Sequence, residues 1–201
     1  MHMTSHWATY GAATDGEPAL EDVDIRPAVA SDCRGVAAII HERDSVPIAD
    51  ARAHCERDLA GKDRLVLVAT VGGELAGFAR AARWERPRGR LPDNVAPSGW
   101  YLLGVIVRDR WRRHGLGREL TKQRVAWIGE RADEAWYFSN ARNQTSIDLH
   151  AQVGFVEVTR DFSFPDASFE GGEGILFRVD LAKDDPAESN AESNAESNAG
   201  A

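Results

Sequence analysis

An apolar run at residues 103–107 passes into a basic, glycine-punctuated turn, and the turn opens directly into an amphipathic stretch. This order predicts a strand, an anion-binding turn and the start of a helix. The free N–H groups and the positive dipole end of a helix N-terminus suit a phosphate. Gly115 and Gly117 let the backbone approach it with no Cβ in between. Three arginines, Arg112, Arg113 and Arg118, add positive charge, so the segment predicts a pyrophosphate site.

The spacing of this turn excludes two common phosphate loops. A P-loop needs Gly-x-x-x-x-Gly-Lys-Ser/Thr and a dinucleotide fingerprint needs Gly-x-Gly-x-x-Gly, and neither is present. The pattern here is Arg112-x-x-Gly115-x-Gly117 after an apolar run. It resembles the acetyl-coenzyme A motif of the GNAT superfamily of N-acetyltransferases.

A second segment supports this resemblance. Residues 143–155 read Asn-Gln-Thr-Ser-Ile-Asp-Leu-His-Ala-Gln-Val-Gly-Phe, where members of the superfamily commonly have Asn, two residues, Ala, two residues, Leu-Tyr, three residues and Gly-Phe. The resemblance covers about residues 25–181. It implies an α/β fold, a twisted mixed sheet of about six or seven strands with helices on both faces.

The apolar patterns predict the elements of such a fold. We expect strands at residues 23–29, 64–71, 74–84, 100–107, 134–139, 155–164 and 174–181. Helices are expected after Ser31 and Asp32, at 49–59, after the glycine turn and at 143–153, the last ended by Gly154 as a left-handed cap. Three prolines make residues 85–99 a loop long enough to be functional.

The charge lies at the two ends of the chain. Residues 1–24 and 184–201 each hold five acidic residues and no basic one, which leaves residues 25–183 at +2 of a total of −8. We therefore expect a flexible segment at 1–22, an acetyltransferase domain at 23–182 and a disordered acidic tail at 183–201, where Ala-Glu-Ser-Asn occurs three times. The nearly neutral domain argues against a nucleic-acid partner.

The sequence lacks the patterns of a membrane protein, an exported protein and a metal-binding protein. No run reaches the ~18 apolar residues of a membrane span, and no signal-peptide pattern is present. Cys33 and Cys55 lack metal spacing, so we expect reduced, partly buried thiols and no metal site. These observations predict a cytoplasmic enzyme, with a homodimer as a candidate assembly.

The resemblance also implies where acetyl-CoA, the co-substrate, would bind. Backbone groups of Val105, Ile106 and Val107 would hold the pantetheine, and Asn143 and Ser146 would contact the cofactor from the next helix. Asn143 would also serve as an N-cap residue. The pyrophosphate would lie on the turn, with Arg112 beside it and the amides of Arg113, His114, Gly115, Leu116, Gly117 and Arg118 beneath it.

His150 stands where the family usually has a tyrosine that can protonate the coenzyme thiolate. A histidine could do the same with a pKa nearer neutrality. On a helix it shares a face with Ser146, Leu149 and Val153, which should look toward the core and the cofactor. A packed, hydrogen-bonded histidine without a proton-transfer role explains the residue equally well.

A general base is not evident, because the stretch 100–104 has no carboxylate where some relatives carry one. Glu85 is the candidate we name as catalytic. The alternatives are a water chain ending at a backbone carbonyl, or the surface groups His41, Asp44, Asp50 and Asp93.

Aromatic and acidic residues predict an acceptor site for a cationic amine. Aromatic faces stack on sugar rings or cations, and carboxylates pair with ammonium groups. The residues named for this site are Trp84, Trp100, Asp166 and Glu170. Residues 134–165 also resemble those of aminoglycoside-modifying N-acetyltransferases, the kasugamycin type among them, which makes an aminoglycoside antibiotic the first acceptor to consider. The alternatives are a protein or peptide amine, or a non-catalytic acyl-CoA-binding sensor.

Overall fold

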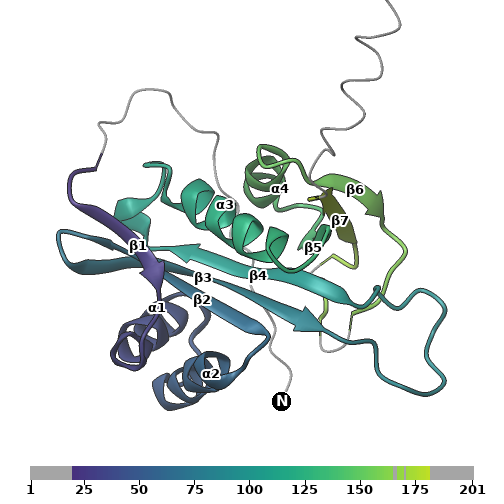
Figure 1. Cartoon of the computed structure of the whole chain (residues 1–201), viewed down its shortest axis with the longest axis horizontal. Coiled ribbons are helices and arrows are strands. Elements are labelled where there is room, and N and C mark those ends of the chain that lie inside the picture. The colour runs from purple at the N-terminus through teal and green to yellow at the C-terminus, as the bar shows by residue number, and fades with distance from the viewer. Residues whose placement is uncertain (1–19, 165–166, 170, 182–201) are drawn as a thin grey trace, which may run out of the picture.

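A computed structural model describes residues 20–164, 167–169 and 171–181. Within them the chain forms one seven-stranded mixed sheet in the order β1-β2-β3-β4-β5-β7-β6 (Figure 1). The strands are β1 Val23–Pro27, β2 Arg64–Val71, β3 Glu74–Trp84, β4 Gly99–Val107, β5 Glu134–Asn140, β6 Val156–Thr159 and β7 Gly174–Asp180. The predicted α/β fold with a mixed sheet is confirmed.

Helices cover both faces of the sheet (Figure 1). α1 (Cys33–Asp44) and α2 (Ile48–Ala60) lie on one face, and α3 (Leu116–Gly129) and α4 (Gln144–Ala151) lie on the other. Successive side chains of β2 point to opposite faces, so the strand contacts both helix layers. Leu65 and Leu67 belong to the core cluster under α3, whereas Val68 packs among the residues of α1 and α2. Apolar residues on both faces are what a central strand covered by two layers requires.

The neighbouring strands β4 and β5 separate soon after they meet. They are parallel and share one pair, Tyr101 with Trp136. On its other side β4 follows β3 closely, but the register shifts so that Ala79 faces Val105 and Arg80 faces Leu103. Gly104 is therefore the extra residue of a β-bulge, which bends the strand and increases its twist. Beyond the Tyr101–Trp136 pair the two strands no longer pair with each other, and the region between them is called here the β4–β5 slot.

One predicted strand is shorter than expected. Residues 155–164 were predicted to be extended throughout, but β6 ends at Thr159. The aromatic residues after it turn back into a cluster on the sheet: Phe164 packs on Trp84 and Phe138 with ring centroids 4.7 Å apart in both cases. Burying these rings outweighs continued pairing at the sheet edge. The predicted terminal segments at 1–22 and 183–201 fall almost wholly outside the described residues.

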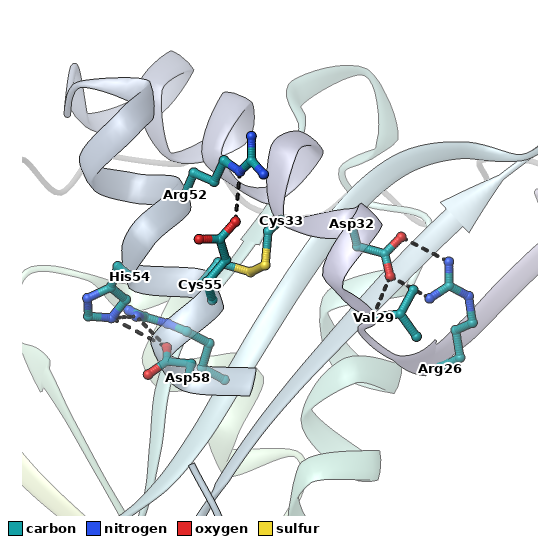
Figure 2. The surroundings of a disulfide bond; sticks show 10 residues. Arg26, Val29, Asp32, Cys33, Arg52, His54, Cys55 and Asp58 are labelled. Carbon is teal, nitrogen blue, oxygen red and sulfur yellow. Dashed lines mark hydrogen bonds and ion pairs between the residues drawn. A yellow bond between two sulfur atoms is a disulfide. The ribbon is translucent and has the colours of Figure 1, made fainter. Parts of the chain in front are cut away.

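The expectation of two reduced thiols is wrong in the structure. Cys33 at the start of α1 and Cys55 in α2 form a disulfide, and both are buried (Figure 2). The spacing of the two cysteines does not predict this bond, because they meet only when the turn at Pro47 folds α2 back against α1. The bond joins the two helices that cover one face of the sheet.

Across the described ranges, no helix has the length and apolar run that a membrane crossing needs. Nor do these ranges bring together three or more His, Cys, Asp or Glu side chains in a group that could hold a metal ion.

Candidate active site

The glycine turn between β4 and α3 has the shape expected of an anion site. Arg113 and Gly115 both have positive φ, at 66° and 81°, which turns the chain sharply into the helix that starts at Leu116. A Cβ built on Gly115 would meet no atom within 4 Å, so the space above the turn is open. Among the described residues no side chain caps this helix start, so its first amides can bind an anion.

Two side chains of the turn, that of Arg112, predicted to lie beside the phosphate, and that of His114, bind backbone carbonyls. Arg112 Nε donates to the carbonyl of Val107 at 2.9 Å, and Arg112 also forms an ion pair with Asp109 at 2.7 Å. The His114 ring nitrogen Nδ1 lies 2.7 Å from the Arg112 carbonyl. Both side chains brace the loop that presents the amides. Arg113 and Arg118 are exposed on its surface.

The β4–β5 slot has features that fit a polar, extended ligand. A Cβ built on Gly104 would meet nothing within 4 Å, so the bulge faces open space in the middle of a sheet. Beyond Tyr101 and Trp136 the edges of β4 and β5 no longer pair with each other. The Ser139 hydroxyl of β5 is buried with no hydrogen-bond partner in the described part of the chain. Buried polar groups are normally satisfied, so these groups suit the amides of a pantetheine arm.

Arg124 of α3 holds the bulge in place and is fully buried. Its Nη1 donates to the carbonyls of Leu103, at 2.6 Å, and Arg80, at 3.0 Å, the two residues that face each other across the bulge. Its Nη2 donates to Thr121 Oγ1 at 2.9 Å, and that hydroxyl donates to the Gly117 carbonyl at 2.8 Å. This chain of bonds connects the bulge at Gly104 to Gly117 at the glycine turn.

The residues expected on α4 lie together as predicted. Asn143 is the N-cap, its side chain accepting from the Ser146 amide at 3.2 Å. His150 is 3 % exposed and faces the core. Near the start of α3, a Cβ on Gly117 would lie 3.8 Å from Leu149 Cδ2, so α4 borders the glycine turn. The helix thus lines the same side of the slot as α3.

His150 is held as a neutral ring. Its Nδ1 bonds to the Ser146 carbonyl at 2.8 Å, and its ring stacks on Tyr137 of β5 with centroids 3.7 Å apart. Burial and the charge of Arg124 lower the pKa of His150 to about 3. Burial and the charge of Arg80 lower the pKa of Arg124 to about 9, so Arg124 keeps its charge at neutral pH. His150 is therefore uncharged at neutral pH.

The structure does not bring Glu85 to the slot. Glu85 follows Trp84, the last residue of β3, which pairs with Gly99 at the start of β4, before the Tyr101–Trp136 pair at which the slot begins. Its side chain is 62 % exposed and pairs with Arg83 at 2.6 Å. Two other base candidates are also engaged, because Asp44 accepts two bonds from Arg43 and the His41 ring binds the Val46 carbonyl.

Two residues named for the acceptor site lie on opposite faces of the sheet. Trp84 joins the aromatic cluster with Phe164 and Tyr101 on the side of α1 and α2. Trp100 is buried under α3, edge-on to Trp127 at 5.2 Å, because β4 alternates its side chains between faces. Trp100 is therefore corrected to a core residue. Asp166 and Glu170 lie outside the described residues.

A cavity of about 690 Å³ lies beside the glycine turn on the α1 face. Its carboxylates are paired: Glu42 with Arg108 at 2.8 Å, Glu74 with Arg110, and Asp109 with Arg112 at 2.7 Å. The remaining lining residues are Ile39, Arg43, Ile106 and Val107. The cavity therefore combines an apolar floor with closely balanced charges.

A sequence profile of the acetyltransferase (GNAT) family matches residues 32–155, which include the bulge, the glycine turn and all of α4. The chain belongs to the GNAT family. Its acetyl donor is therefore acetyl-CoA. No curated protein matches the chain in a sequence search.

Solved GNAT structures share the fold at low identity. The ribosomal-protein-S18-alanine N-acetyltransferase of Escherichia coli is 19 % identical, with a TM-score of 0.60 over 81 % of this chain and 96 % of that one. The ribosomal-protein-alanine N-acetyltransferase of Brucella melitensis is 20 % identical, with a TM-score of 0.61 over 78 % of this chain and 98 % of that one. A phosphinothricin acetyltransferase of Sinorhizobium meliloti, solved with acetyl-CoA, is 16 % identical, with a TM-score of 0.61 over 80 % of this chain and 89 % of that one.

Arg124 and Tyr137 are not part of any motif in the sequence. A signal for Arg124 exists, because it follows the buried Leu116 and Leu120 at four-residue intervals on α3 and so falls on their inward face. An arginine at such a position must find partners inside the protein. The signal for Tyr137 is weaker, since an aromatic residue in a buried strand is usually a core residue.

Proposed function

We propose that this acetyltransferase transfers the acetyl group to a primary amine of a small molecule. The observation that carries the proposal is a fastened β3–β4 loop, residues 85–98, which we take to border the acceptor. The β3–β4 loop is fastened to the segment after β6: Val95 bridges Ser163, the Ala96 amide donates to the Ser163 carbonyl at 2.9 Å, and Asn94 Nδ2 donates to Asp161 at 2.7 Å. A peptide acceptor needs an open groove, and these contacts oppose one.

The chain's own groups divide the work of acetyl transfer. The first amides of α3 would bind the pyrophosphate of the donor, and the unpaired edge of β4 would orient its pantetheine arm. When bound, acetyl-CoA supplies a thioester carbon that a neutral amine can attack. Holding both reactants in line replaces a bimolecular encounter and supplies much of the rate enhancement. The leaving thiolate then needs a proton.

Aminoglycosides are the first acceptors to test, on the resemblance of residues 134–165. One observation weighs against a polycation. The described carboxylates around the 690 Å³ cavity are each bonded to an arginine, so an ammonium group would have to displace one of these partners. A small amine with one cationic group fits this balanced surface better.

The test is thiol release from acetyl-CoA over a panel of amines. The panel holds aminoglycosides including kasugamycin, amino acids, simple polyamines, and peptides with free N-terminal alanine. The proposal predicts turnover with a small amine and none with the peptides. Turnover confined to peptides would overturn it in favour of a protein acceptor. Tight acetyl-CoA binding without turnover on any amine would favour the sensor.

One observation opposes the cytoplasmic location expected from the sequence. The Cys33–Cys55 disulfide is a feature that oxidising compartments maintain and a reducing cytosol does not. Counting thiols in protein taken directly from cells would decide between the two: two thiols per chain fit the cytoplasm, and none fits an oxidising compartment.

A further inference from the structure

Tyr137 occupies the apex of the β4–β5 slot. It is the first β5 residue beyond the Tyr101–Trp136 pair, where β4 and β5 stop pairing. Its ring lies between His150 of α4, at 3.7 Å, and Phe177 of β7, at 4.8 Å, and it is 4 % exposed. Two stacked neighbours fix the direction of its hydroxyl.

Polar groups surround that hydroxyl inside an otherwise apolar core. Ser146 Oγ lies 3.5 Å from it. Ser139 stands two residues along β5 on the same face, with its own hydroxyl buried and without a partner among the described residues. A core tyrosine usually anchors its hydroxyl on a strong acceptor, as Tyr101 does on the Pro97 carbonyl at 2.6 Å. The long contact to Ser146 leaves the Tyr137 proton available to a ligand in the slot.

At neutral pH the one ring proton of His150 is engaged with the backbone and is not free for a ligand. A carbonyl can only accept, so the bond from Nδ1 to the Ser146 carbonyl places the single proton of the neutral imidazole on Nδ1. The other ring nitrogen, Nε2, is then unprotonated. Burial and the nearby charge of Arg124 lower the pKa of His150 to about 3, which opposes a second proton. Burial raises the pKa of Tyr137, so its hydroxyl stays protonated.

We propose that the hydroxyl of Tyr137, and not the imidazole of His150, protonates the thiolate that leaves during acetyl transfer. The inference rests on the proposed function. As the amine nitrogen bonds to the acetyl carbon, the carbon–sulfur bond breaks and the sulfur takes the Tyr137 proton. The phenolate regains a proton through Ser146 Oγ and solvent, and the amine releases one, so the exchange balances without another reactant.

Arg124 makes the apex favourable for transient negative charge. The guanidinium is fully buried, and its hydrogen-bond partners in the described part of the chain are the carbonyls of Arg80, Leu103 and Leu120 and the hydroxyl of Thr121, with no carboxylate among them. It lies close enough to depress the pKa of His150. A buried cation without a counter-charge stabilises a developing thiolate or phenolate nearby more than water would. Tyr137 and Arg124 thus act on the same atom, one by proton transfer and the other by charge.

The first experiment needs no acceptor amine. Coenzyme A is bound to each protein and its thiol is titrated by the ultraviolet absorbance of the thiolate. If the Tyr137 hydroxyl donates to the sulfur, the bound thiol ionises at lower pH in the wild type than in Tyr137→Phe, by about one pH unit for a charged hydrogen bond. Tyr101→Phe removes an equally buried hydroxyl from the other face and should titrate as wild type.

The second experiment measures turnover and coenzyme A affinity of the same proteins. Tyr137→Phe should lower kcat by about 10²-fold with little change in affinity or melting temperature. His150→Phe keeps the stack and should retain most of kcat. Equal thiol titrations in wild type and Tyr137→Phe, or a loss confined to His150→Phe, would overturn the assignment. Failure of the wild type to bind coenzyme A would instead overturn the proposed function.

Discussion

The guanidinium of Arg124 donates to the carbonyl of Leu103 at 2.6 Å, and this bond ties α3 to the bulge that parts β4 from β5. The same side chain donates to the carbonyl of Arg80, which faces Leu103. The bulge beside the slot is therefore held by a buried side chain of α3.

Replacing Arg124 with Met should keep the volume and remove every bond to the bulge. Two buried carbonyls would lose their partner, which should lower the free energy of unfolding by about 3 kcal/mol. Acetyl-CoA affinity should fall as well, because the slot loses its brace. Urea denaturation and calorimetry check the two effects. Lys122→Met on the exposed side of α3 is the control, and equal stability of the two variants would contradict this role.

His150→Gln tests whether the histidine has a packing role. The variant loses the stack that helps to fix Tyr137, so we expect a lower melting temperature and a kcat loss well below the ~10²-fold of a lost general acid. His150→Tyr should cost further stability by overpacking a site that is 3 % exposed. A kcat loss of about 10²-fold in the Gln variant, with normal stability, would restore the histidine as the acid.

Asp58 should make stability depend on acid pH. Burial alone would raise its pKa, but hydrogen bonding from His54 and the charge of Arg80, together with Arg64 at 2.5 Å, bring it to about 2 (Figure 2). A carboxyl with a lowered folded-state pKa stabilises the protein above its unfolded pKa and loses that effect as pH falls through the folded value. We expect about 2 kcal/mol to disappear between about pH 5 and pH 1.

Asp58→Asn supplies the comparison for this pH dependence. Its free energy of unfolding should be lower than that of wild type at pH 6, since two arginines lose their carboxylate. The difference between the two proteins should shrink as the pH is lowered toward 2. A difference that stays constant over that range would show that Asp58 is not the titrating group.

The disulfide gives a prediction that a thiol reagent can check. Protein purified without reductant and unfolded should show no free thiol, and reduction should release both of the two cysteines in the chain. The reduced form should be less stable by about 3 kcal/mol, the value for a loop of this size. The double variant Cys33→Ser, Cys55→Ser should not respond to reductant. Two thiols before reduction would contradict the bond.

Most of the fold could be predicted because its periodic patterns are local. The strand at residues 64–71 and the hairpin at Gly72 and Gly73 need only alternation and a turn. The glycine turn and α4 were found by spacing. Contacts between distant segments could not be predicted this way: the Cys33–Cys55 bond and the stack of Tyr137 on His150 each depend on how elements pack. Trp100 was misplaced because composition does not tell which face of a strand a residue takes.

The central claim is that acetyl-CoA binds on the glycine turn, and calorimetry on Gly117→Asp tests it most directly. A Cβ at Gly117 meets only Leu149 Cδ2 at 3.8 Å, and a carboxylate suits a helix N-terminus, so the variant should fold. Gly117→Asn adds the same volume without the charge and separates the two effects. We predict at least about tenfold weaker coenzyme A binding for Asp, about 1.4 kcal/mol, and a smaller loss for Asn. Unchanged affinity in a folded Gly117→Asp protein would contradict the account.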